Sequence, residues 1–274
     1  MMLELRAAWA VARKELQIAR RYPLQLINEV MQPLYQFLLP SLLLGATFYV
    51  GGRAAGLQAS AGTYDLAGYL FLGMVVGGLV SAVFWDMAFG IKREMDSGTL
   101  EPMWLTPTRP ETTVLGRAIS GLTLSVLASA ILVAVGIIFF GAAIAGALLA
   151  AVPAMLLASV SMVGIGYMIA SAVMVMRDPN FMIDATSFAF SMLSGVAFPV
   201  TVLPLFVQPI SYVLPTTYAV DLLRYYALGT RPLLAPALEW AALVAFAGIT
   251  VLLGLRLFLR TEHRMRVLGT TGQH

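Results

Sequence analysis

The sequence predicts an all-α integral membrane protein with six transmembrane helices. Hydrophobic residues make up 59% of the 274 and charged residues only 11%, whereas roughly a quarter of the residues of a soluble domain are charged. Several uncharged stretches are long enough to cross about 30 Å of hydrocarbon. We therefore expect a single transmembrane domain over residues 1–274, in which short polar segments join the spans.

Residues 1–22 predict an amphipathic helix at the membrane interface. Its apolar stripe has helical spacing and consists of Leu5, Trp9, Ala12, Leu16 and Ala19. Three arginines spaced by seven follow one flank, where they can reach phosphate headgroups: Arg6, Arg13 and Arg20. A helix packed on the protein's own surface stays an open alternative. A secretory signal is disfavoured, because Glu15 interrupts the apolar run.

The first two spans follow from two uncharged runs. The run from Val30 to Gly52 has 23 residues and predicts the first span. After a polar link over residues 51–65, the run from Leu66 to Trp85 predicts the second span, which continues as a helix to Ile91. Asp86 falls near its end, and we expect it to be a satisfied residue near the membrane boundary; a place on a substrate path is the alternative.

The third and fourth spans come from one stretch. Residues 118–176 are uncharged over 59 positions, too many for one crossing, so they predict a helical hairpin. The cluster of Gly and Pro between Gly141 and Pro153 predicts the turn, with spans near 113–140 and 152–176. A small-residue stripe recurs every four positions and predicts close helix packing: Gly121, Ser125 and Ser129.

The last third of the chain is interrupted by prolines. The fifth span is predicted over residues 181–202, and residues 203–235 are predicted to form a re-entrant segment. That segment holds two short helices, Leu205–Val213 and Thr217–Leu228, with Thr216 or Thr217 as the cap of the second. Asp221 and Arg224 have the spacing of a surface ion pair. Residues 239–258 predict the sixth span, followed by a basic tail over residues 259–274.

The distribution of basic residues predicts the orientation. With the N-terminus inside, four cytoplasmic segments hold 14 of the 17 Lys and Arg residues: residues 1–22, 92–117, 177 and 256–274. The outer segments hold only Arg53, Arg224 and Arg231. Because cytoplasmic segments carry an excess of Lys and Arg, this asymmetry predicts that both termini are cytoplasmic and that the re-entrant helices are extracellular.

The segment 92–117 is a polar island in an otherwise apolar chain. It holds eight charged residues and three prolines, Pro102, Pro107 and Pro110. It predicts a cytoplasmic loop with a short helix after Thr99, which Pro107 ends. Such a loop is a docking surface for a soluble partner; a solvated loop without a partner is the alternative.

Several kinds of chemistry are disfavoured by residue content. The only histidines are His263 and His274, in the tail, which leaves no His-based hydrolase or metal site in the spans. No phosphate-binding G-x-x-x-x-G-K-[ST] motif is present, so we expect no ATP site in this chain. The acids lie near span ends, which disfavours ion-coupled transport.

The order of these motifs resembles the membrane subunit of ABC type-2 exporters, the group that includes daunorubicin-resistance, Nod-factor, O-antigen and teichoic-acid permeases. The resemblance covers nearly the whole chain. It rests on the amphipathic N-terminal helix, Arg93-Glu94, Gly98-Thr99-Leu100-Glu101, Leu105-Thr106-Pro107, Phe198-Pro199-Val200 and the run from Leu214 to Arg224. Pro102 departs from the longer apolar helix that is common in the family.

The resemblance implies a coupling helix in the loop after the second span, docked on a separate ATPase subunit that binds ATP and Mg. The implied contact residues are Glu94, Gly98, Thr99, Leu100, Glu101, Trp104, Leu105 and Thr106. A second permease copy completes the path, and an extracellular gate is expected at Phe198, Pro199, Pro215, Tyr218, Asp221 and Arg224. The implied location is the bacterial inner membrane, with lipid and an ATPase dimer as partners and without nucleic acid.

The expected function is therefore an ATP-driven export permease, which is a transport subunit and not itself an enzyme. Uncharged spans favour an apolar or amphipathic cargo such as a lipid, a lipid-linked glycan or a drug. Five methionines in the spans fit such a cargo, and core packing explains them equally well: Met155, Met162, Met168, Met174 and Met192. A membrane scaffold without transport and an ion-coupled transporter remain the alternatives.

Overall fold

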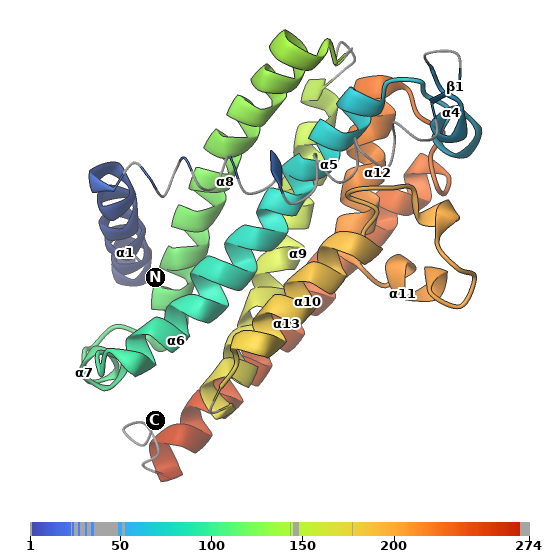
Figure 1. The fold of residues 1–274 in the computed structure, drawn as a ribbon. Helices are drawn as coiled ribbons and strands as arrows, with labels where there is room; N and C mark the ends of the chain where they lie inside the picture. The colour runs from blue at the N-terminus through green and yellow to red at the C-terminus, as the bar shows by residue number, and fades with distance from the viewer. Residues whose placement is uncertain are drawn as a thin grey trace.

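The structure is a computed structural model that describes residues 2–22, 49–50, 53–142, 148–176 and 178–268, with the single residues 24, 27, 31, 34, 35 and 144. Long helices run side by side in one bundle (Figure 1). The predicted first span, residues 30–52, lies outside the described residues apart from isolated positions. The bundle has an end that carries α7 and an opposite end that carries α4, called here the α7 end and the α4 end.

Four helices of the described part are long and apolar enough to cross a membrane: Leu66–Asp96, Pro110–Phe140, Leu148–Val175 and Pro236–Val267. The first is continuous through α5 (Leu66–Ser81), the π-helical η2 (Ala82–Ala88) and α6 (Phe89–Asp96). The others are α8 (Pro110–Phe140), α9 (Leu148–Val175) and α13 (Pro236–Leu268). They correspond to the predicted second, third, fourth and sixth spans.

The predicted fifth span is wrong in its extent. In place of a helix over residues 181–202, α10 (Asn180–Leu193) has 14 residues, about 21 Å at 1.5 Å per residue and short of a full crossing. Gly195 ends it by adopting a left-handed conformation with φ of 81°. Pro199 and the short 3-10 helix η3 (Val200–Val202) follow.

Two short helices occur where two were expected, α11 (Gln208–Tyr212) and α12 (Pro215–Leu228). The predicted threonine cap is wrong. Pro215 occupies the first turn of α12 and no side chain caps it; the Thr217 hydroxyl instead donates to the carbonyl of Ser211 at 2.7 Å. Helix α12 packs against α5, α9 and α13, so it belongs to the core of the bundle.

Close helix packing depends on small residues. Among the helices that the structure describes, α9 and α13 share the most extensive contact, and a Cβ atom on Gly164 would overlap the backbone of Thr250. The predicted stripe on α8 also packs inside the chain. Gly121 lies against Asp86, and Ser125 lies against Gly78 of α5.

The remaining elements cover the bundle. α1 (Met2–Arg21) packs along α8 through an alanine stripe, Ala8, Ala12 and Ala19, and leaves Leu5 and Trp9 exposed. The predicted stripe is therefore split between protein and exposed surface. A two-residue antiparallel pair, β1 (Tyr49–Val50) and β2 (Arg53–Ala54), precedes α4 (Ala55–Ala61).

Candidate functional site

The loop between α6 and α8 forms the α7 end of the bundle. Gly98, with φ of 66°, turns the chain after α6. The amide of Thr99 donates to the carbonyl of Glu94 at 2.9 Å, which closes the end of α6. The five residues of α7 (Leu100–Trp104) follow, and α8 starts with Pro110 in its first turn. The short helix is thus held between two membrane-length helices (Figure 1).

The structure divides the predicted contact residues into an exposed and a buried group. Gly98, Thr99, Leu105 and Thr106 are exposed, and Leu105 is 82% exposed. Leu100 is only 2% exposed and anchors α7 in the core. Glu94 is also turned inward, so these two side chains drop out of the predicted contact. The side chains of Glu101 and Trp104 lie outside the described residues.

Glu94 forms an ion pair with Arg117 of α8. The side chains of both residues are largely buried, at 15% and 7% exposure. A small cavity beside the pair is lined by Leu100, Met103 and Phe258 among others. Sequence reasoning missed this pair; the available signal was Arg117 itself, the single charge within the otherwise apolar length of α8 after its first turn.

Further polar contacts attach α1 and α9 to the start of α8. The Thr112 hydroxyl donates to Glu4 of α1 at 2.6 Å. The Tyr167 hydroxyl of α9 donates to the carbonyl of Glu111 at 2.7 Å. The first turns of α8 are therefore fixed to three other helices.

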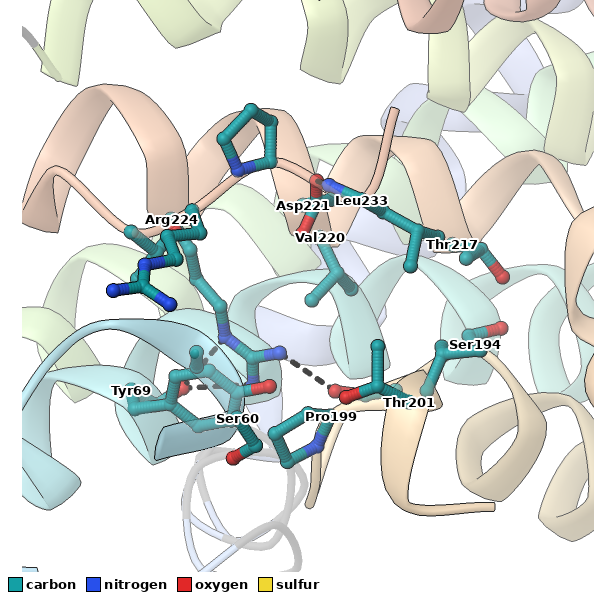
Figure 2. Close-up of a pocket in the computed structure, with 16 residues that line it drawn as sticks. Ser60, Tyr69, Ser194, Pro199, Thr201, Thr217, Val220, Asp221, Arg224 and Leu233 are labelled. Carbon is teal, nitrogen blue, oxygen red and sulfur yellow. Dashed lines mark hydrogen bonds between the residues drawn. The ribbon is translucent and has the colours of Figure 1, made fainter. Parts of the chain in front are cut away.

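At the α4 end, Arg224 of α12 is the central side chain. It is 3% exposed, and its guanidinium lies 3.3 Å from the ring centroid of Tyr69. It donates to the carbonyls of Tyr69, Gly195 and Val196 at 2.7–3.0 Å. Figure 2 shows this side chain reaching between α5 and the segment after α10. One arginine thus joins α12, α5 and the end of α10.

Asp221 does not pair with Arg224, so the predicted surface ion pair is wrong. Asp221 accepts a hydrogen bond from the amide of Leu233 at 2.6 Å; Figure 2 labels the two residues side by side. Glu239 accepts from the next amide, Leu234, at 2.8 Å. Burial raises the pKa of Asp221, and the Leu233 amide opposes this shift. Two neighbouring carboxyl groups therefore hold the loop between α12 and α13.

A pocket of about 120 Å³ opens beside these groups. Of the predicted gate residues, Pro199, Asp221 and Arg224 line it. Pro215 and Tyr218 are buried inside α12 instead, and Phe198 is half-buried without reaching the pocket. Sequence reasoning missed Tyr69, Thr230 and Glu239, because only folding brings residues 69, 195 and 224 together. The buried Thr230 hydroxyl lines the pocket and has no hydrogen-bond partner in the described part of the chain.

Neither end brings together metal ligands among the residues that the structure describes, since no three His, Cys, Asp or Glu side chains gather there. The two ends share an arrangement of helices. Each places a short helix beside long helices that buried polar contacts join, Glu94 with Arg117 at the α7 end and Arg224 at the α4 end. This arrangement suits the transmission of movement along the bundle.

Comparison with known proteins agrees with this architecture. A family model described as ABC-2 type transporter matches residues 6–228, from the first turns of α1 to the end of α12. No match was found among curated proteins.

Proposed function

We propose, on the premise that this chain belongs to the ABC-2 type transporter family, an export function driven by a separate ATPase. As a family member it is a membrane-embedded transport subunit. The ATPase subunit would dock on the α7 end. ATP and Mg would be bound by the ATPase subunit and not by this chain. The cargo would leave the cytoplasm of a bacterial cell.

The observation that carries the proposal is the exposed loop around α7. Leu105 exposes 82% of its surface at the tip of a polar segment, where an apolar side chain is well placed to enter a groove of a partner. The loop connects α6 to α8, and Glu94 with Arg117 ties these helices together. A push on the loop is thereby delivered to two membrane-length helices at once.

The proposed cargo is apolar or amphipathic, such as a lipid, a lipid-linked glycan or a drug. The support is that α8 carries no charge after Arg117 and that α9 carries none at all. Met162 and Met174 do not add to this support, because they are buried at 0% and 1% exposure and fill the core; Met155, Met168 and Met192 are half-buried.

We further propose that two copies of the chain enclose the path and that the α4 end is the extracellular gate. The polar contacts of Arg224, Asp221 and Glu239 would close it by holding α12 against α5, α10 and the loop before α13. Membrane lipid would contact the exposed Leu5 and Trp9 of α1.

The test is reconstitution of the chain in liposomes with a co-expressed ABC ATPase subunit, using a fluorescent phospholipid as the cargo probe. We expect the two proteins to purify together and the probe to move only when ATP is hydrolysed, with or without a protonophore. Movement that a protonophore abolishes while ATP is present would indicate ion coupling. A chain that binds no ATPase and moves no probe would be a scaffold.

A further inference from the structure

A polar track crosses the contact between α8 and the helix that runs from α5 to α6. Asp86, Gly90 and Glu94 are spaced by four residues on one helix, and Arg117 and Gly121 are spaced by four on α8. The Arg117 side chain passes over Gly90, where an added Cβ atom would come within 2.5 Å of Nη1. One turn away, the Asp86 carboxyl lies over Gly121. Both glycines therefore keep this track open.

The ion pair on the track is incomplete. Arg117 contacts Glu94 through Nη2 and Oε1. The other two atoms, Nη1 of Arg117 and Oε2 of Glu94, are buried and have no hydrogen-bond partner among the described residues. Buried charges are stabilised only when their remaining hydrogen-bonding atoms are also satisfied. Separation of this pair therefore costs less free energy than separation of a bidentate pair.

Asp86 is a further carboxylate on the same track, and it interacts electrostatically with the guanidinium of Arg117. It accepts no hydrogen bond from any residue that the structure describes, and it interacts electrostatically with Arg93 of its own helix, Arg117 of α8 and Glu15 of α1. Arg117 in turn interacts with Glu15, Arg93 and Asp86. The two acids lie on opposite sides of Gly90, each one helical turn away along the track.

The helix that carries Asp86 has a local irregularity. Asp86 lies in the π-helical η2, at whose end the amide of Phe89 donates to the carbonyl of Phe84, five residues back. The backbone hydrogen bonds of such segments are less regular than those of an α-helix, and these segments often occur at functional sites. A shift of α6 along α8 by one turn, about 5.4 Å, would bring Asp86 to the level that Gly90 now occupies.

We propose that Arg117 is a positioning residue that holds Glu94 in the state described and exchanges it for Asp86 when α6 moves along α8 during transport. The exchange gives the helix pair two discrete positions, as one-turn shifts do in other switching proteins. It rests on the proposed function, because the ATPase supplies the movement through α7.

The first test compares Asp86→Asn with Asp184→Asn, which removes an exposed acid from α10. Both variants keep the Glu94 and Arg117 pair, so thermal unfolding and assembly with the ATPase should be unchanged. ATP hydrolysis by the reconstituted complex should fall about tenfold for Asp86→Asn, within the usual range of coupling between sites, and stay at the wild-type rate for Asp184→Asn. Asp86→Glu should restore most of the rate.

The second test reverses the resting pair in the double variant Glu94→Arg, Arg117→Glu. A purely structural pair would be restored by this reversal, in unfolding temperature and in hydrolysis. With the exchange, the reversed pair keeps the unfolding temperature but not the hydrolysis rate, because residue 117 now repels Asp86. Adding Asp86→Arg should then restore hydrolysis.

Wild-type hydrolysis in Asp86→Asn, or in the reversed pair with Asp86 intact, would overturn the exchange and leave the proposed function standing. If the reversed pair does not fold, the comparison of Asp86→Asn with Asp184→Asn decides alone. A wild-type complex that hydrolyses no ATP would instead contradict the proposed function, and the exchange with it.

Discussion

Arg224 is the residue on which the α4 end depends most. Its charge is satisfied by three backbone carbonyls and an aromatic ring, from α5 and the end of α10, without a carboxylate within ion-pair distance in the described chain. Backbone carbonyls cannot ionise or move away as side chains do. The arginine therefore has a structural role, and its loss removes the hydrogen-bond donors to these three buried carbonyls.

Replacement of Arg224 by Met should be strongly destabilising. The change removes the guanidinium donors to the carbonyls of Tyr69, Gly195 and Val196, and we expect the free energy of unfolding to fall by about 1–3 kcal/mol for each carbonyl left without a partner. Thermal unfolding of the purified chain in detergent measures this. Arg231→Met is the matched control, since Arg231 is exposed. Equal unfolding temperatures for the two variants would contradict the structural role of Arg224.

Asp221 predicts a pH dependence at the same end. Burial raises its pKa above the ordinary 3.8, beside the Glu239 carboxyl, the Arg224 guanidinium and the Leu233 amide. The folded chain then keeps this proton to higher pH than the unfolded chain does, so this group's contribution to the free energy of unfolding falls as pH rises from 3.8 through the raised pKa. Unfolding temperatures between about pH 4 and pH 8 should therefore vary less in Asp221→Asn; an unchanged slope would contradict the assignment.

At the residue scale, sequence reasoning found the segments but not the direction of side chains. It placed Glu94 and Leu100 with Leu105 on one docking surface, yet the first two face the core and the third faces out. Periodicity in a segment as short as α7 does not define a buried face. Arg224, a predicted gate residue, lines the pocket at the α4 end, and its role in gating stays a prediction. Its carbonyl partners are up to 155 positions away in sequence, so they could not be predicted.

At the scale of elements, the uncharged runs predicted the long helices well because length and charge alone determine whether a segment can cross a membrane. The predicted fifth span was too long for the same reason. Residues 181–202 are apolar throughout most of their length, and only the turn at Gly195 marks the end of the helix. The π-helical η2, which packs against α8 and α9, has no signal in the composition of residues 82–88.

Helix α9 offers a sharp test of element packing. Gly164→Ala places a Cβ atom into the backbone of Thr250 on α13, and overpacking of this kind costs about 1–3 kcal/mol. Gly248→Ala, on α13, meets nothing within 4 Å and should stabilise the helix slightly. A lower unfolding temperature for the first variant and an equal or higher one for the second are expected; the reverse order would contradict the packing.

At the scale of the whole molecule, the bundle predicts which loops share a side of the membrane. Because the chain lacks Cys, single replacements can be labelled without background. Ser97→Cys, at the exposed α7 end, should react with a membrane-impermeant thiol reagent only from the cytoplasmic side. Ala59→Cys, exposed on α4, should react only from outside. Labelling of both from one side would contradict the proposed orientation.

The most direct measurement of the central claim is the affinity of the chain for its ATPase after Leu105→Ala. Leu105 is 82% exposed at the α7 end, and loss of an apolar anchor there should weaken assembly about tenfold and lower ATP hydrolysis by the complex without changing the unfolding temperature. Leu149→Ala is the matched control, because Leu149 is 85% exposed at the start of α9, outside the proposed contact. Wild-type assembly and hydrolysis in Leu105→Ala would contradict docking at this loop, whereas a loss confined to Leu105→Ala would place the drive for transport at α7.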